Sequence, residues 1–95
     1  MDDARLANGR AETLAERGWG NAAIAARLEA EGIPEADAAS AIAKLEPETA
    51  RAARTAGAVS DPKKAWALLA RRGFDEEAIE AVVETLDGET GRGLG

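Results

Sequence analysis

Large apolar side chains recur at helical spacing along this chain, and stretches rich in alanine and charged residues separate them. The clearest face belongs to the segment 76–86, where Ile79, Val82, Val83 and Leu86 follow the i, i+3, i+4, i+7 spacing of one helix side. Alanine is the best helix former, and β-branched residues are rare, so strands are not expected. The pattern predicts six short helices, near residues 3–16, 21–31, 35–45, 48–57, 62–72 and 76–86.

Glycine followed by a large apolar residue marks three of the junctions between these helices, at Gly18, Gly32 and Gly73. Glycine adopts the left-handed conformation that ends a helix, because it carries no Cβ. With Asp75 as the N-cap of the last helix, Phe74 is placed to pack against Ile79 as a hydrophobic staple. The same frame pairs Trp19 with Ile24. We therefore assign both aromatic residues to helix junctions and favour this role over stacking on nucleic-acid bases.

An internal repeat becomes visible when the chain is shifted by about 41 residues, a spacing typical of stacked helical units. Glycine then falls on glycine and apolar on apolar across two helices: Leu28 on Leu69, Gly32 on Gly73, Ile33 on Phe74, Ile42 on Val83 and Leu45 on Leu86. The sequence therefore predicts an all-α protein of two tandem three-helix repeat units, elongated and curved. The first unit spans residues 1–45 and the second 46–87, and the Gly-rich tail 88–95 is expected to be disordered.

Composition excludes most catalytic chemistry. The 95-residue chain has no Cys, His or Tyr, so it lacks the thiolates and imidazoles on which many nucleophilic and metal sites depend. The acidic run at 75–77 fits a helix N-terminus better than a metal site. We expect no enzyme activity, no cofactor and no metal. No apolar run reaches membrane-spanning length and no signal peptide is recognisable, which predicts a cytoplasmic protein.

Charge is unevenly distributed along a chain whose net charge is −6. Residues 51–74 contain six basic side chains and one acidic one, whereas residues 75–89 contain seven acidic side chains and no basic one. A phosphate-binding surface and an ordinary solvated helix face both explain the basic stretch. The candidate contacts in this stretch are Arg51, Arg54, Lys63, Lys64, Arg71 and Arg72.

Three strings in order, "DDARLA" at 2–7, "RGWGNAAIAARLEAEGIPEADAASAI" at 17–42 and "AWALLARRGFDEEAIEAVVETL" at 65–86, resemble the bacterial RecX regulatory proteins. The resemblance implies tandem three-helix repeats, of which this chain holds the later two. It also implies a protein that binds the RecA recombinase filament and the single-stranded DNA within it, and inhibits recombination and ATPase activity in DNA repair and the SOS response. Because stacked units contact only their neighbours, we expect a monomer. The matching contacts are Arg17, Arg27, Arg71 and Arg72, and Lys63 and Lys64 join them on charge alone.

The chain departs from that family in its net negative charge and in Leu6, where an aromatic residue is usual. The net negative charge and the smaller number of units predict weak DNA binding by the isolated protein. Two other functions stay open. The segment from Gly73 to Leu86 also resembles the loop and helix of ubiquitin-associated domains, which are small protein-interaction modules. A weak direct DNA-binding helical protein is the third candidate, with Asn21 and Arg27 as the available base-reading side chains.

Overall fold

The structure, a computed structural model, describes the backbone of residues 2–94 and the side chains of residues 2–86. The described residues form six helices and no strand: α1 (Asp3–Glu16), α2 (Asn21–Ala30), α3 (Glu35–Ala43), α4 (Glu48–Thr55), α5 (Pro62–Arg71) and α6 (Glu76–Leu94). The all-α prediction is confirmed. The first five helices begin at the predicted residues and end within about two residues of the predicted ends.

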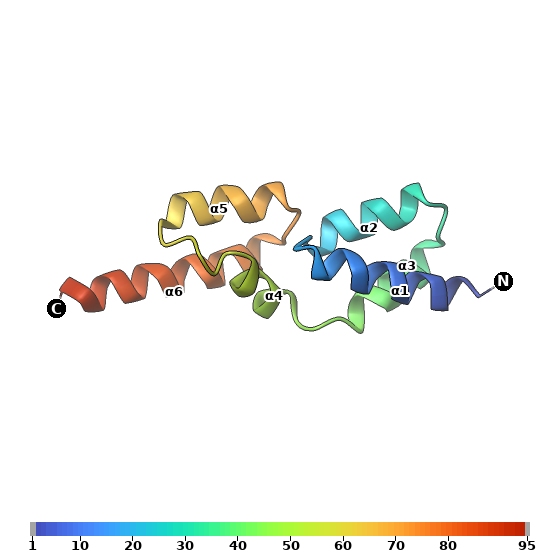
Figure 1. Ribbon diagram of the computed structural model, residues 1–95, viewed down its shortest axis with the longest axis horizontal. Helices are drawn as coiled ribbons and strands as arrows, with labels where there is room; N and C mark the ends of the chain where they lie inside the picture. The colour runs from blue at the N-terminus through green and yellow to red at the C-terminus, as the bar shows by residue number, and fades with distance from the viewer. Residues whose placement is uncertain (1, 95) are drawn as a thin grey trace.

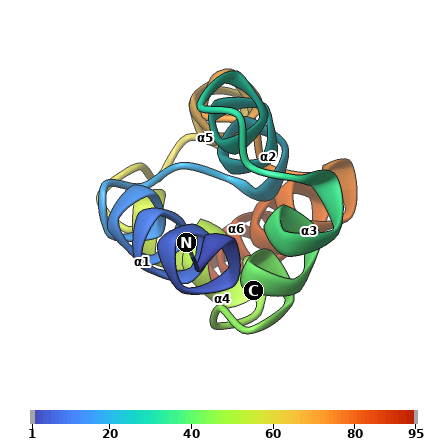
Figure 2. The same cartoon turned by 90° about the vertical axis from the view of Figure 1, so that its right-hand side faces the viewer.

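The helices form two groups of three that follow one another along the long axis of the molecule (Figure 1). The chain measures 58 × 19 × 19 Å, so it is elongated as the repeat predicts. Viewed along the axis, α2 and α5 overlie one another, and α1 and α3 lie on opposite sides of the first group (Figure 2). We call α1–α3 unit 1 and α4–α6 unit 2.

Each unit has a hydrophobic core of its own. The buried residues of unit 1 are Ala7, Ala11, Leu14, Ile24, Leu28, Ile33, Ala38 and Ala41. Those of unit 2 are Ala52, Ala56, Ala65, Leu69, Phe74, Ala78, Ile79 and Val82. Alanine supplies much of both cores, which lets the helices approach closely but limits the apolar area that each unit buries.

The three glycines at the helix junctions end their helices in the predicted way. Gly18, Gly32 and Gly73 have φ values of 89°, 83° and 82°, in the left-handed region. At the end of α5, the Gly73 amide donates to the carbonyl of Ala70, and the Phe74 amide donates to that of Leu69. These two bonds define a Schellman motif, in which the residue after the glycine packs back onto the helix. Trp19 and Ile33 make the equivalent bonds at the ends of α1 and α2.

Phe74 therefore has two structural roles. It closes the end of α5, and it lies just before α6, in the same buried cluster as Ile79. Trp19 is half-buried against the core of unit 1. The third aromatic residue, Trp66, lies on the surface of α5 with 38% of its area exposed.

The end of α6 differs from the sequence prediction. The periodic pattern stops at Leu86, where the predicted helix ends, whereas α6 continues to Leu94. The disorder expected for residues 88–95 stays a prediction. Glycine weakens a helix by about 1 kcal/mol relative to alanine, whereas proline breaks one, and no proline follows Leu86. The glycines at 88, 91 and 93 are therefore compatible with continued helix. Gly95 lies outside the described residues.

Candidate functional site: the basic junction between the two units

The two units meet through two turns, each of which contains a glycine followed by an aromatic residue: Gly18–Trp19 after α1 and Gly73–Phe74 after α5. The Gly20 amide donates to the carbonyl of Arg72 at 2.8 Å, and the Ala22 amide donates to that of Gly73 at 3.1 Å. The backbones come so close that a Cβ on Gly20 would lie 2.4 Å from the amide nitrogen of Phe74. The near-copies "RGWG" and "RRGF" are thus the two halves of one contact, which requires glycine in both turns.

Arg51 of α4 fills the centre of this junction. It is only 4% exposed, and it is the one buried charged residue among those described. Its guanidinium donates to the carbonyl of Glu46 at 2.9 Å, to that of Trp19 at 3.3 Å and to Asn21 Oδ1. Burial lowers the pKa of Arg51, while the nearby carboxylates of Glu48 and Glu46 oppose that shift. Arg51 therefore joins α4 to the turn before α2.

Glu48 completes the junction from the first turn of α4. Its Oε2 accepts hydrogen bonds from the amides of Asn21 at 2.7 Å and Asp75 at 3.3 Å. These amides lie at the N-termini of α2 and α6, where backbone N–H groups have no partner within the helix. A single carboxylate thus caps one helix of each unit, at the ends that favour negative charge.

Arg72, the C-cap of α5, reaches across to unit 1. Its Nη1 donates to the carbonyl of Arg17 at 3.1 Å, and its guanidinium carbon lies 5.1 Å from the centre of the Trp19 ring. This distance is within the range of a cation–π interaction. The Trp19 ring is thereby held under a positive charge at the surface of the junction.

A basic hollow opens where these groups meet, with a volume of about 290 Å³. It is lined by Ala15, Glu16, Arg17, Gly18, Arg51, Arg54, Thr55 and Arg72. Four arginines and one glutamate give the lining a net charge of +3 in a chain of net charge −6. Arg54 forms an ion pair with Glu46 but keeps 66% of its side chain exposed. Planar guanidinium groups bind phosphate oxygens well, so the hollow has the chemistry of a polyanion site.

The structure brings four of the eight predicted contact residues into this hollow and leaves the other four outside its lining. Arg17 and Arg54 are exposed and Arg72 is half-buried. Arg51 needs a correction: its hydrogen bonds are made within the protein, because α4 packs against the other unit's turn, so it supports the hollow rather than contacting a partner. Lys63, Lys64 and Arg71 are exposed on α5. Arg27 is exposed on α2, where it pairs with Glu31 at 3.2 Å.

The sequence reasoning missed the acidic and amide groups that assemble this junction: Asn21, Glu46 and Glu48. Their positions near predicted helix starts were visible in the sequence. The contact of these residues with a unit far away in the chain was not. The one available signal was the repeated glycine-aromatic pair, Gly18–Trp19 and Gly73–Phe74, which we interpreted as two separate helix ends.

Neither a metal centre nor a membrane-spanning helix is found among the residues that the structure describes. No group of His, Cys, Asp or Glu side chains in that part of the chain has the arrangement of a metal site. None of the helices there combines the length and apolar character needed to cross a membrane.

The fold and the junction define an all-α protein built from three-helix units. Residues 2–42, which span nearly all of unit 1, match the family model described as RecX, second three-helix domain. Over these residues the chain is similar to the second three-helix domain of RecX, and the resemblance stated from the sequence is confirmed there. No curated protein and no solved structure matches the chain. That unit 2 is a further repeat of the same family stays a prediction from the 41-residue shift.

Proposed function

We propose that this protein is a non-enzymatic regulator that binds the RecA–single-stranded-DNA filament and inhibits its recombinase and ATPase activities in DNA repair and the SOS response. It acts in the cytoplasm as a monomer, without a cofactor. The RecX match over residues 2–42 supports the partner. The observation that carries the proposal is the basic hollow, where Arg17, Arg54 and Arg72 gather in an otherwise acidic chain.

The proposed contact with DNA phosphates combines the hollow with the exposed basic side chains of α5, Lys63, Lys64 and Arg71. Helices α2 and α5 lie along one edge of the molecule (Figure 1), so Arg27 on α2 extends the same set. Phosphate contacts of this kind make binding strongly salt-dependent. A chain with net charge −6 binds free DNA weakly, which is why the filament, offering protein and DNA together, is the proposed target.

The experiment measures ATP hydrolysis by RecA on single-stranded DNA while this protein is titrated in. We expect inhibition by the wild type and loss of inhibition in the Arg17→Glu/Arg54→Glu variant, because both side chains are exposed at the hollow. The matched control, Arg5→Glu/Lys44→Glu, makes the same change in net charge at exposed residues outside the hollow. Absence of inhibition by folded wild-type protein would contradict the proposal.

Direct binding to DNA is the second candidate, since the hollow fits a phosphate without any recombinase. Binding to a single-stranded oligonucleotide at two salt concentrations separates the two functions. The ubiquitin-associated alternative loses its main support in the structure. Phe74, which would mark the binding loop, is only 6% exposed and belongs to the core of unit 2.

A further inference from the structure

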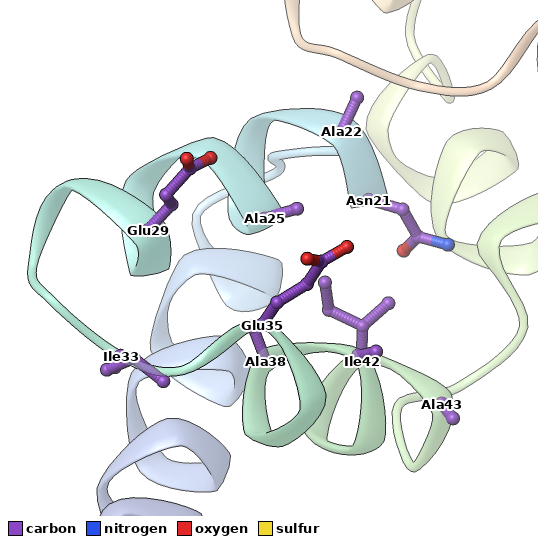
Figure 3. A pocket seen from close by; sticks show the side chains of 10 residues that line it. Asn21, Ala22, Ala25, Glu29, Ile33, Glu35, Ala38, Ile42 and Ala43 are labelled. Carbon is purple, nitrogen blue, oxygen red and sulfur yellow. The ribbon is translucent and has the colours of Figure 1, made fainter.

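Unit 1 has an apolar groove between α2 and α3, with a volume of about 820 Å³ (Figure 3). It is lined by Asn21, Ala22, Ala25, Glu29, Ile33, Glu35, Ala38, Ala39, Ile42 and Ala43. Five of these ten residues are alanines, so the groove lies between two helices whose facing side chains are small. It shares no lining residue with the basic hollow.

The internal repeat shows how the two units differ at the positions that line the groove. The 41-residue shift places Ala25 on Trp66 and Ala38 on Ile79. Unit 2 thus has two large apolar side chains at the positions where unit 1 has two methyl groups. The space in unit 1 has the size and polarity that a bulky apolar side chain from another molecule would fill.

The groove is also acidic. Glu29 of α2 and Glu35 of α3 are both exposed, and no basic residue lines the groove. Figure 3 shows the Glu35 carboxylate over the space between the two helices. Two uncompensated carboxylates beside an apolar floor favour a ligand that carries positive charge next to a large apolar group. They disfavour nucleic acid, whose phosphates they would repel.

We propose that this groove docks a cationic amphipathic segment of the recombinase protein, in which one bulky apolar side chain is flanked by Lys or Arg. The inference rests on the proposed function and adds a protein contact to the DNA contact. Helix α5 carries this combination of groups itself, since the exposed Trp66 lies about one helical turn after the exposed Lys63. The groove lies between α2 and α3, whereas the hollow is lined from α1, α4 and α5, so the two sites can be occupied together.

The test compares two variants with matched controls. Ala25→Trp fills the groove with the residue that unit 2 has at that position, and Ala26→Trp puts the same side chain on an exposed neighbour outside the groove. Glu29→Lys reverses a charge of the groove in the last turn of α2, where a cation suits the helix. Glu12→Lys makes the same reversal on the exposed surface of α1. Circular dichroism establishes folding, and Glu29→Lys decides the outcome where Ala25→Trp does not fold.

Binding of each dye-labelled variant is measured against RecA without DNA, RecA on single-stranded DNA, and the oligonucleotide alone. We expect Ala25→Trp and Glu29→Lys to weaken binding to both RecA forms by about tenfold or more, the scale of one buried large side chain. Binding to the oligonucleotide should not fall, and both controls should behave as wild type.

The outcomes separate the two proposals. No binding of wild-type protein to the filament overturns the proposed function, and the occupant of the groove with it. Filament binding that Ala25→Trp and Glu29→Lys retain at wild-type strength overturns the groove inference alone. Sedimentation velocity of the protein alone tests whether a second copy of the chain occupies the groove instead. Self-association in wild type that is lost in Ala25→Trp would assign the groove to a second copy, and would overturn the inference.

Discussion

The backbone amide of Gly20 lies 2.8 Å from the carbonyl oxygen of Arg72, so the turn that ends α1 is bonded to the turn that ends α5. No side chain of either residue takes part in this bond. The contact between the units therefore depends on two glycine-containing turns that can approach each other closely, with Arg51 and Glu48 satisfying the polar groups around them.

Replacing Gly20 by alanine should destabilise the protein. The new Cβ would lie 2.4 Å from the Phe74 amide nitrogen and 2.5 Å from the Gly73 carbonyl oxygen, and both are backbone atoms that cannot rotate away. We expect a loss of about 1–3 kcal/mol, as for other overpacked sites. Thermal unfolding followed by circular dichroism measures it. Gly9→Ala is the control, because nothing lies within 4 Å of a Cβ there and the helix should gain about 0.5–1 kcal/mol. Equal melting temperatures for the two variants would contradict the close contact.

A second glycine pair separates backbone strain from contact between the units. Gly32 and Gly73 have nearly the same φ, 83° and 82°, so alanine at either position incurs the left-handed penalty of about 1–2 kcal/mol. A Cβ on Gly32 meets nothing within 4 Å, whereas one on Gly73 would lie 2.6 Å from the Cβ of Ala23. Urea unfolding should therefore show a larger loss for Gly73→Ala. An equal loss in the free energy of unfolding for Gly32→Ala and Gly73→Ala would mean that the contact between the units at Gly73 adjusts without cost.

Arg51 and Arg54 lie one turn apart on α4 but should respond very differently to substitution. Arg51→Met leaves the Trp19 carbonyl and the Asn21 side chain without their donor, at a cost of about 1–3 kcal/mol for each buried group left unpaired. Arg54→Met removes a side chain that is 66% exposed, and the free energy of unfolding should change by no more than about 0.5 kcal/mol. Urea titrations of the two variants provide the comparison. A stability loss in Arg54→Met as large as that in Arg51→Met would be inconsistent with this placement.

The fold could be predicted from the sequence because its determinants are local. Glycine before a large apolar residue ends a helix through its own backbone conformation. The helix that follows is then identified by side-chain periodicity within about ten residues. Both signals act within one helix and one turn, and this is why the helix starts at Asp3, Asn21 and Glu76 agree with the prediction.

The site could be predicted only in part, because it depends on contacts between distant segments. Arg51 and Arg54 look alike in sequence, and only the approach of the Trp19 turn buries one and leaves the other exposed. Trp66 looks like a core residue by its apolar character, yet its place on α5 leaves 38% of it exposed. The groove between α2 and α3 could not be predicted from the sequence, because alanine occurs equally well on a buried helix face and in an open groove.

The ion pair between Arg10 and Glu31 predicts a pH dependence. Arg10 donates to the two Glu31 carboxylate oxygens at 2.9 and 2.7 Å, and these hydrogen bonds hold the pKa of Glu31 below its ordinary value. The carboxylate therefore stabilises the fold at pH values above its unfolded-state pKa, and this contribution is lost as the pH falls through the folded-state pKa.

Melting temperatures of wild type and Glu31→Gln should accordingly differ near neutral pH and converge in acid. Arg10→Gln should show a smaller difference of the same form, since Glu31 keeps its ion pair with Arg27 at 3.2 Å. Two parallel curves across the whole pH range would show that the pair does not contribute to stability. Since the two side chains keep 32% and 31% of their area exposed to solvent, added salt should also reduce the difference.

Trp19 should report on the occupant of the basic hollow. Its ring lies 5.1 Å from the guanidinium of Arg72, so a phosphate that draws Arg72 away changes the surroundings of the indole. The chain has two tryptophans, and Trp66→Phe leaves Trp19 as the only one. Adding single-stranded oligonucleotide to that variant should change its emission, and raising the salt concentration should reverse the change. Trp19→Phe, which retains Trp66 on α5, is the matched control. A response from Trp66 alone would locate the phosphate contact along α5 beside Lys63 and Lys64, and would remove the hollow from the proposed interface.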